Sequence, residues 1–372
     1  MVNESRLLHQ FLRLVQIDRV STNERAVADY LKDHLFKLGL EVQEDNAGQA
    51  IGGDAGNLFA RLKGDPKYPA LLFLAHMDTV SPGKGIKPSI KDGVIRSDGT
   101  TILGADDAIG LSSILEALHV IDEKNIPHGN IEILFTVAEE IGLKGMKNFD
   151  TSLLTSKLGF CLDGGGPLGT VITQAPAHNF INFIFKGKAS HAGAEPEKGI
   201  SAIQAASLAI SKMMLGRIDE ETTANIGIIQ GGDGFNIIPS LVKANGEARS
   251  LSVDKLNKQI DHMMKTARAA AQYYGAEVEC IVENSYSPIN LDTNSQVVQI
   301  SLQALNKIGI TGSVEFTGGG ADANILNGKD IPTVVFGIND RNAHTLEESI
   351  PVDDLIKVGE FVVSIIETSV EK

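Results

Sequence analysis

The stretch LLFLAHMDTV (Leu71–Val80) joins a run of five apolar residues to a histidine and an aspartate that stand two positions apart. A short, unbroken apolar run is typical of a strand that is buried on both faces of a parallel sheet. In sheets of this kind, ligands bind at the carboxyl ends of the strands. The stretch therefore predicts an α/β fold in which His76 and Asp78 lie at the functional edge of a sheet.

The order of the predicted elements around this strand indicates two domains. Helical patterns at Ala26–Gly39 and Asp106–Glu123 alternate with strand-like runs, which predicts a mainly parallel sheet covered by helices. Between residues 179 and 287 the predicted order changes to β-α-β-β-α-β, the ferredoxin-like unit. We therefore predict an α/β domain in two parts, 1–178 and 288–372, that is interrupted by an inserted ferredoxin-like domain, 179–287.

Composition excludes several classes of function. The 372-residue chain carries a net charge of −14 and has no basic stretch, which disfavours nucleic-acid and anionic-membrane partners. No apolar run of about 18 residues predicts a membrane span, and the first residues do not resemble a signal peptide. Cys161 and Cys280 are too few for a disulfide framework, which fits a reducing compartment. We therefore expect a cytoplasmic protein.

Acidic and imidazole side chains follow several of the predicted strands and loops. The candidates are His76, Asp78, Asp106, Asp107, Glu139, Glu140, Asp163 and His344. Histidines and carboxylates without cysteine suit a hydrolytic zinc, cobalt or manganese site better than a structural zinc–thiolate site. So many carboxylates at one edge would repel each other without cations. Two divalent ions would neutralise them and could activate a water molecule.

Six segments resemble the signatures of the dizinc exopeptidases, the family that includes peptidase T, aminoacylases and glutamate carboxypeptidases. The segments are HMDTV, DGTTILGADDAIG, TVAEEIGLKG, LDGGGPLG, KASHAG and AHTLEES. The second segment is most similar to that of the peptidase T-like tripeptide aminopeptidases. The resemblance covers nearly the whole chain, and it implies a zinc-exopeptidase catalytic domain whose inserted domain serves as a lid and in dimerisation.

The resemblance also implies roles for individual residues. It implies five metal ligands, which are His76, Asp106, Glu140, Asp163 and His344. Asp106 is similar to the carboxylate that bridges both metals, and the peptide bond after it is then cis. Asp78 resembles the acid that orients the histidine at position 76. Glu139 resembles the general base. Neighbouring residues of a strand face opposite sides, so the turn at EEIG must re-aim one of the two adjacent glutamates for both to face the metal site.

Four residues outside the metal cluster are candidates for contacts with the substrate. His191 in KASHAG resembles the residue that a lid supplies to the developing oxyanion. Arg249 is similar to an arginine that binds a substrate carboxylate, for which a guanidinium fork is suited. Asn236 is a further candidate for a substrate contact. Asp322 follows three consecutive glycines, and we expect it near the amino group of the substrate.

The resemblance implies hydrolysis of short peptides, with release of the N-terminal residue of tripeptides by a water that two Zn²⁺ ions (or Co²⁺ or Mn²⁺) activate. Other hydrolases on the same scaffold would share this metal chemistry: a dipeptidase, a carboxypeptidase or an N-acyl-amino-acid deacylase. A non-catalytic metal- or peptide-binding protein is a remote alternative, because the base and all five ligands are present. We expect a homodimer that forms through the inserted domain.

Overall fold

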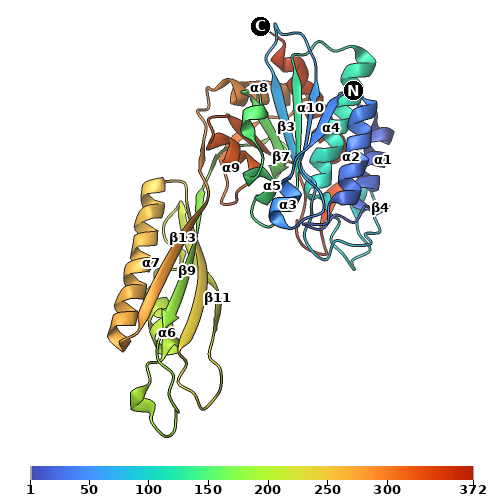
Figure 1. Ribbon diagram of the computed structural model, residues 1–372. Helices are drawn as coiled ribbons and strands as arrows, with labels where there is room; N and C mark the ends of the chain where they lie inside the picture. The colour runs from blue at the N-terminus through green and yellow to red at the C-terminus, as the bar shows by residue number, and fades with distance from the viewer. Residues whose placement is uncertain (1, 372) are drawn as a thin grey trace. The chain divides into compact units, whose positions relative to one another are not determined.

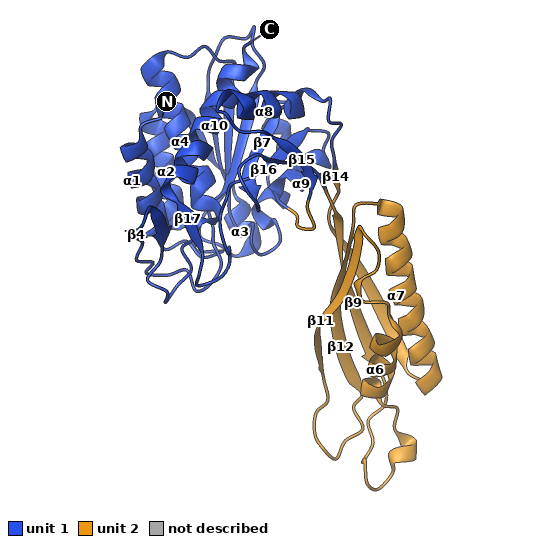
Figure 2. Ribbon diagram, turned by 180° about the vertical axis from the view of Figure 1, so that it is seen from behind, with its two compact units in different colours: residues 1–174, 290–316, 321–372 blue, residues 175–289, 317–320 orange. Residues whose placement is uncertain are grey.

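The computed structural model describes residues 2–371, which form two compact units (Figures 1 and 2). Unit 1 comprises the residues up to 174, residues 290–316 and the residues from 321 onward, and unit 2 comprises residues 175–289 and 317–320. Strand β9 of unit 2 begins at Ala177, before the predicted boundary at 179. The segment 317–320, which the sequence placed in the catalytic domain, groups with unit 2.

Unit 1 is built on a mixed sheet with the order β1-β2-β6-β3-β7-β16-β8-β14, in which β15 also pairs with β8. Its strands are β1 Glu41–Glu44, β2 Leu58–Leu62, β3 Leu71–His76, β6 Ile131–Thr136, β7 Gly159–Gly164, β8 Thr170–Ala175, β14 Ile289–Asn290, β15 Ser313–Phe316 and β16 Thr333–Gly337. The central strands β6, β3, β7 and β16 run parallel. Strand β2 pairs antiparallel with β1 and β6, and β8 pairs antiparallel with β16. The predicted α/β fold with a mainly parallel central sheet is confirmed.

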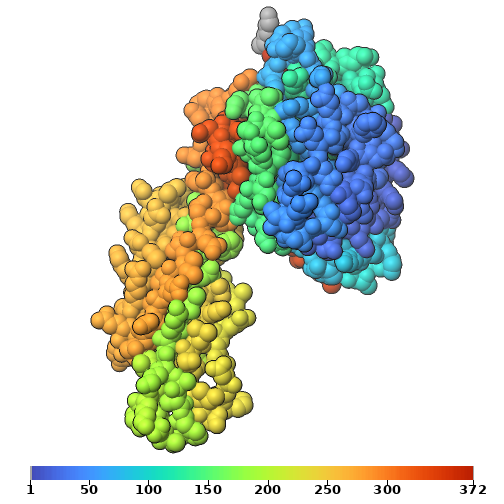
Figure 3. All heavy atoms as spheres, in the orientation of Figure 1, coloured from blue at the N-terminus to red at the C-terminus, as the bar shows by residue number. Residues whose placement is uncertain are grey.

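Eight α-helices belong to unit 1 within the described residues. They are α1 Glu4–Val15, α2 Arg25–Lys37, α3 Ala47–Ile51, α4 Ala105–Lys124, α5 Lys144–Lys147, α8 Gln296–Lys307, α9 Asp322–Asn327 and α10 Val352–Ser369, with the short 3-10 helix η1 Thr151–Leu153. Residues of the N-terminal helices, blue in Figure 3, form a continuous part of the surface of this unit. No helix between residues 2 and 371 is both long and apolar enough to cross a membrane.

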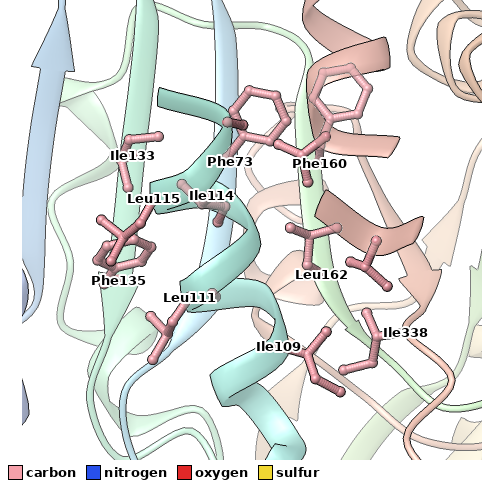
Figure 4. Packing of buried hydrophobic residues seen from close by; sticks show 14 of the residues in the cluster. Phe73, Ile109, Leu111, Ile114, Leu115, Ile133, Phe135, Phe160, Leu162 and Ile338 are labelled. Carbon is pink, nitrogen blue, oxygen red and sulfur yellow. The ribbon is translucent and has the colours of Figure 1, made fainter. Parts of the chain in front are cut away.

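Helix α4 lies across the centre of the sheet and carries the site residues at its start. Its apolar side chains, among them Ile114 and Leu115, belong to one buried cluster with Phe73 of β3 and Phe135 of β6 (Figure 4). All of these residues are buried, and burial of each such side chain contributes about 2 kcal/mol. Helices α1 and α10 pack on α4 from outside. This packing fixes the first turn of α4 next to the carboxyl ends of the central strands.

A small antiparallel sheet, which the sequence did not predict, stands beside this core. It consists of β4 Ser89–Lys91, β5 Val94–Arg96 and β17 Ser349–Pro351, in the order β17-β5-β4. Because β17 follows the loop that carries His344, its pairing with β5 fixes one end of that loop.

Unit 2 has the predicted ferredoxin-like order of elements. Its elements are β9 Ala177–Lys186, η2 Pro196–Lys198, α6 Ala202–Lys212, β10 Gly216–Arg217, β11 Thr222–Gly231, β12 Leu241–Ser250, α7 Val253–Tyr274 and β13 Glu277–Tyr286. The sheet is antiparallel, with the order β10-β11-β12-β9-β13. Helices α6 and α7 pack on each other and on the sheet over alternate strand residues such as Ile181, Phe183 and Phe185.

Candidate metal centre

Three strands deliver site residues to the same edge of the unit 1 sheet. His76 is the last residue of β3, and Asp163 is the last residue but one of β7. Strand β6 ends at Thr136, so Glu139 and Glu140 lie in the turn after it. Ala138 in this turn has a φ of +52°, a left-handed conformation that redirects the chain. The chain therefore leaves the strand direction one residue before the EEIG segment, where a turn was predicted.

The fourth contribution comes from the start of α4. Gly104 precedes this helix with a φ of +68°, and the Asp106–Asp107 peptide bond is cis, as predicted. The buried Asp107 carboxylate accepts hydrogen bonds from the backbone N–H groups of Gly110 at 2.8 Å and of His76 at 3.2 Å. Asp107 thereby joins the start of the helix to the end of β3, and Asp106 projects toward the same edge.

Asp106 connects two histidines through its two carboxylate oxygens. His76 Nε2 lies 2.8 Å from Asp106 Oδ1 and 3.7 Å from Asp163 Oδ1. His344 Nε2 lies 3.3 Å from Asp106 Oδ2 and 2.9 Å from Glu140 Oε1. The five side chains thus form two histidine–carboxylate groups that share one aspartate. This is the arrangement expected of a carboxylate that bridges two cations.

The charges of these groups show why the cluster suits cations. Burial tends to raise the pKa of Asp106, but hydrogen bonds from the His344 and His76 rings outweigh burial and lower this pKa. Hydrogen bonds to Asp106 and Glu140 in turn raise the pKa of His344 to about 10. Protons on the imidazoles therefore supply positive charge to the carboxylates, and metal ions would replace those protons at the same nitrogens.

Carboxylates exceed imidazoles at this edge even when both histidines are charged. Burial, followed by the charge of Glu139, raises the pKa of Asp163 well above its ordinary value. Two sets of side chains have ligand atoms within 4.8 Å of one another, namely His76 with Asp106 and Glu140, and His76 with Glu139 and Asp163. These nitrogen and oxygen donors fit hydrolytic metal ions.

Glu139 lies among these groups, within 4.8 Å of ligand atoms of His76 and Asp163. It is nearly buried, with 9% of its surface exposed. Burial, and next to it the charges of Asp322 and Glu140, raise the pKa of Glu139 well above its ordinary value, although His76 opposes the change. A buried carboxylate with a raised pKa is a stronger base than an exposed one, which is the property that a general base requires.

Asp78 contacts both the histidine and the glutamate turn. Its backbone oxygen lies 3.0 Å from His76 Nδ1, whereas its carboxylate Oδ1 lies 3.5 Å from the same nitrogen. The carboxylate accepts hydrogen bonds from the N–H groups of Glu139 at 2.9 Å and Glu140 at 3.3 Å. Asp78 therefore orients His76 mainly through its main chain and holds the glutamate turn through its side chain.

Asp322 also lies in unit 1, as the first residue of α9. It is 3% exposed, and its Oδ2 accepts a hydrogen bond from Thr136 at the end of β6. Its Oδ1 has no hydrogen-bond partner among the described residues. Burial raises the pKa of Asp322 to about 6.

The remaining predicted substrate contacts belong to unit 2. His191 forms an antiparallel bridge with Ile237, and the backbone oxygen of Asn236 accepts a hydrogen bond from Ala192. The sequence-distant His191 and Asn236 are therefore neighbours. Arg249 lies on β12 and already has a carboxylate partner, since its Nη2 is 3.0 Å from Glu247 Oε2.

Comparison with known proteins decides the family. The sequence profile of peptidase family M20/M25/M40 matches residues 72–368. The chain belongs to this peptidase family. A Bacillus subtilis relative, the uncharacterised protein YqjE, is 46% identical to this M20-family peptidase, and the alignment covers 99% of each chain. Peptidase T of Clostridium botulinum is 28% identical over 97% of this chain and 98% of its own.

Solved structures of peptidases share the fold of this M20-family chain throughout. The aminopeptidase PepT of Bacillus cereus superimposes with a TM-score of 0.92 at 44% identity, with full coverage of both chains. A tripeptidase of Staphylococcus aureus superimposes with a TM-score of 0.95 at 40% identity, again with full coverage. The protein is therefore an enzyme of the M20 family, and peptide hydrolysis is its general reaction.

Three residues of this M20-family site were not assigned from the sequence. Glu348 accepts hydrogen bonds from the N–H groups that precede and begin α4, at Gly104, Ala105 and Asp106. Glu24 and Arg19 come from the segment before α2, which is far away in sequence. Glu348 lies inside the AHTLEES segment and could have been singled out there. The segment QIDRVSTNE that contains the other two reads as an ordinary polar loop.

In this M20-family site, Glu24 supports the turn that carries Glu139 and Glu140. Its titration makes the stability of the folded protein depend on pH. It is fully buried, and its Oε1 accepts hydrogen bonds from Thr22 N at 2.8 Å and Ala138 N at 3.1 Å. Burial, and next to it the charge of Asp78, raises the pKa of Glu24 from 4.5 to about 7. The folded protein therefore holds this proton more tightly than the unfolded chain does, so stability is lost as pH rises from about 4.5 to about 7.

Glu24→Gln keeps an acceptor for both N–H groups and removes the charge. We expect the variant to melt at a higher temperature than the wild type at pH 8, with a benefit of roughly 3 kcal/mol, and to lose this advantage near pH 4.5. Melting temperatures of the chelator-treated proteins across this range test the expectation. Glu132→Gln is the control of opposite sign, because hydrogen bonds from Ser156 and Thr155 lower the pKa of the buried Glu132 despite its burial. If the difference in melting temperature between Glu24→Gln and the wild type did not change with pH, the raised pKa of Glu24 would be contradicted.

Proposed function

We propose that this M20-family peptidase removes the N-terminal residue of tripeptides with a pair of zinc ions held around Asp106. The observation that carries the proposal is the contact of each Asp106 oxygen with a different histidine, at 2.8 Å for His76 and 3.3 Å for His344. The substrate class rests on the relatives of 40% identity or more with full coverage, one named an aminopeptidase and the other a tripeptidase.

The residues of the chain have distinct tasks in this reaction. Two divalent ions, Zn²⁺ with Co²⁺ or Mn²⁺ as alternatives, would lower the pKa of a water molecule and polarise the scissile carbonyl. Glu139 takes the proton of the attacking water and then gives it to the leaving amine. For this task the carboxylate needs no bond to a metal ion. Asp78 holds Glu139 in place through the backbone hydrogen bond at 2.9 Å.

His191 is suited to donate a hydrogen bond to the developing oxyanion. Its Nδ1 accepts hydrogen bonds from Gly193 N at 3.2 Å and Ala194 N at 3.0 Å. Because Nδ1 is an acceptor, the proton of the neutral ring resides on Nε2. The loop therefore presents an N–H donor at Nε2, which is the group that an oxyanion requires.

The two ends of the peptide would be recognised by groups of opposite charge. Asp322 keeps one carboxylate oxygen without a partner among the described residues, and we assign it to the ammonium group of the substrate. Arg249 and Asn236 are assigned to the carboxyl side. A substrate carboxylate at Arg249 would have to compete with Glu247, which lies 3.0 Å from the guanidinium.

A panel of three peptides tests the proposed specificity. We expect the zinc-loaded protein to hydrolyse trialanine. N-acetylation should reduce kcat/KM by at least about 100-fold, because it removes the ammonium group that Asp322 is assigned to bind and leaves that buried carboxylate without its partner. C-terminal amidation should have the smaller effect, because the substrate carboxylate must compete with Glu247 for Arg249. Chromatography of the products of the amidated peptide identifies the end that is cleaved, because N-terminal cleavage releases alanine and C-terminal cleavage releases alaninamide.

Asp322→Asn is the matched variant for this panel. It should reduce the ratio of the rates on free and acetylated peptide while leaving the metal content unchanged. Preferential cleavage of the acetylated peptide would favour a deacylase, and loss of activity on amidation alone would favour a carboxypeptidase. The homodimer, the cytoplasmic location, and the absence of nucleic-acid and membrane partners stay predictions.

A further inference from the structure

Arg19 is a fully buried arginine that forms no ion pair with a carboxylate within 4.0 Å among the described residues. Among the described residues, Arg19 is the largest residue whose side chain is fully buried. Arginine is almost never fully buried unless it is paired. Its guanidinium instead donates hydrogen bonds to three backbone oxygens: Nη1 to Met77 at 2.9 Å and to Asp78 at 2.8 Å, and Nη2 to Gly104 at 2.5 Å.

These three oxygens belong to the two loops that carry His76 and Asp106. Met77 and Asp78 directly follow His76, and Gly104 lies two residues before Asp106. One rigid, planar guanidinium therefore spans the main chains of both loops. A Cβ atom at Gly104 would lie 3.3 Å from Arg19 Nη2, a tight contact, and the φ of +68° at this position also favours glycine.

The other side of the same turn is held by Glu348. Its carboxylate accepts hydrogen bonds from Gly104 N at 2.7 Å, Ala105 N at 2.7 Å and Asp106 N at 3.2 Å. The turn is thus fixed by a cation at its carbonyl side and by an anion at its N–H side. Both charges are provided by the protein and are present before any metal binds.

The main chain of Arg19 is attached to the same loop as its side chain. Thr79 N donates a hydrogen bond to Arg19 O at 3.0 Å, and Ser21 N donates to Thr79 O at 3.2 Å. Ser21 Oγ donates to Asp78 Oδ2 at 2.6 Å. The main chain of Arg19, from which the guanidinium extends, therefore cannot shift without moving the loop after His76.

Charge favours a cation at this position. Burial lowers the pKa of the Arg19 guanidinium, while the nearby carboxylates of Asp78, Asp107 and Glu348 raise it. An arginine remains charged in proteins. Arg19 thus contributes permanent positive charge close to the acidic edge of the sheet.

We propose that Arg19 is a positioning residue of the metal centre, which sets the separation of His76 and Asp106 before cations bind. The inference rests on the proposed function, because it concerns the affinity of that centre for metal. Lysine cannot replace the guanidinium in this role, since a single ammonium group does not reach two loops with a planar fork. A site that must first assemble binds metal more weakly than one that is already formed.

Arg19→Met and Arg19→Lys test the proposal in the full-length protein, with Arg6→Met as the matched control. Arg6 pairs with Glu116 and Glu123 of α4, so its loss removes a partly buried arginine without touching the metal loops. The first measurement is the dissociation constant of Zn²⁺, obtained by competition with a chromophoric chelator. The second is hydrogen exchange of the amides of residues 77–79 and 104–107 in the metal-free protein.

We expect both Arg19 variants to bind Zn²⁺ at least about tenfold more weakly than the wild type, as for other outer-shell partners of metal ligands. Exchange at residues 104–107 should accelerate in the metal-free variants. Arg6→Met should lower the melting temperature and leave both readouts unchanged. Arg19→Lys retains the charge and keeps the test decisive if Arg19→Met does not fold.

Folded Arg19 variants with wild-type affinity and wild-type exchange would overturn this inference and leave the proposed function intact. A wild-type protein that bound no Zn²⁺ would instead overturn the proposed function, and this inference with it. If Arg6→Met weakened Zn²⁺ binding as much as Arg19→Met does, the effect would be one of general stability and the positioning role would be wrong.

Discussion

Glu139→Gln should abolish nearly all turnover while the metal content stays that of the wild type. Removal of a general base costs about 10²- to 10⁴-fold in rate. Glu139 lies within 4.8 Å of ligand atoms of both His76 and Asp163, yet its proposed task requires no bond to a cation. Glutamine keeps the size of the side chain and cannot accept the proton. Steady-state rates on trialanine and elemental analysis of the same sample provide the two readouts.

Glu347→Gln is the matched control for this variant. Glu347 is exposed and lies in the loop that carries His344, so neutralising it changes the charge near the site without changing the base. We expect its turnover to equal that of the wild type. If Glu139→Gln retained turnover, the base would be a different residue. If it lost its metal, Glu139 would be a ligand rather than a base.

Asp106→Asn should weaken both cation sites, whereas variants of the unshared carboxylates should weaken one. Asp106 contacts both histidines, while Asp163 pairs with His76 and Glu140 with His344. Loss of a directly bound, charged ligand should cost more than the 10- to 100-fold that outer-shell partners cost. We therefore expect the affinity of both ions to fall by more than about 100-fold.

Calorimetric titration of the metal-free variants with Zn²⁺ measures this difference. Asp163→Asn and Glu140→Gln should each retain one tight site, and Asp106→Asn should retain none. Asp98→Asn is the control, since Asp98 is exposed and pairs with Lys87. An Asp106→Asn protein that kept one site of unchanged affinity would show that this carboxylate serves a single ion.

The parts of the fold that were predictable are those with strong local patterns. The apolar run before His76 becomes β3, and the run before Glu139 becomes β6, because each strand is buried on both faces. The turn that follows β6 was foreseen from the adjacency of Glu139 and Glu140. The resemblance to the exopeptidases supplied what local patterns do not contain, such as the cis bond after Asp106.

The parts that were missed depend on pairing between distant segments. The sheet of β4, β5 and β17 joins residues near 90 to residues near 350, and no local pattern encodes such a pairing. Arg19 is the sharper case. An arginine in a polar segment predicts an exposed side chain, and its burial follows from three carbonyl groups that only the tertiary fold brings together.

Native mass spectrometry of the wild-type chain, freed of metal and then incubated with Zn²⁺, tests the central claim most directly. The arrangement of two histidine–carboxylate groups around a shared aspartate predicts two tightly held ions for each chain. A chain that held one ion or none would contradict the paired metal centre.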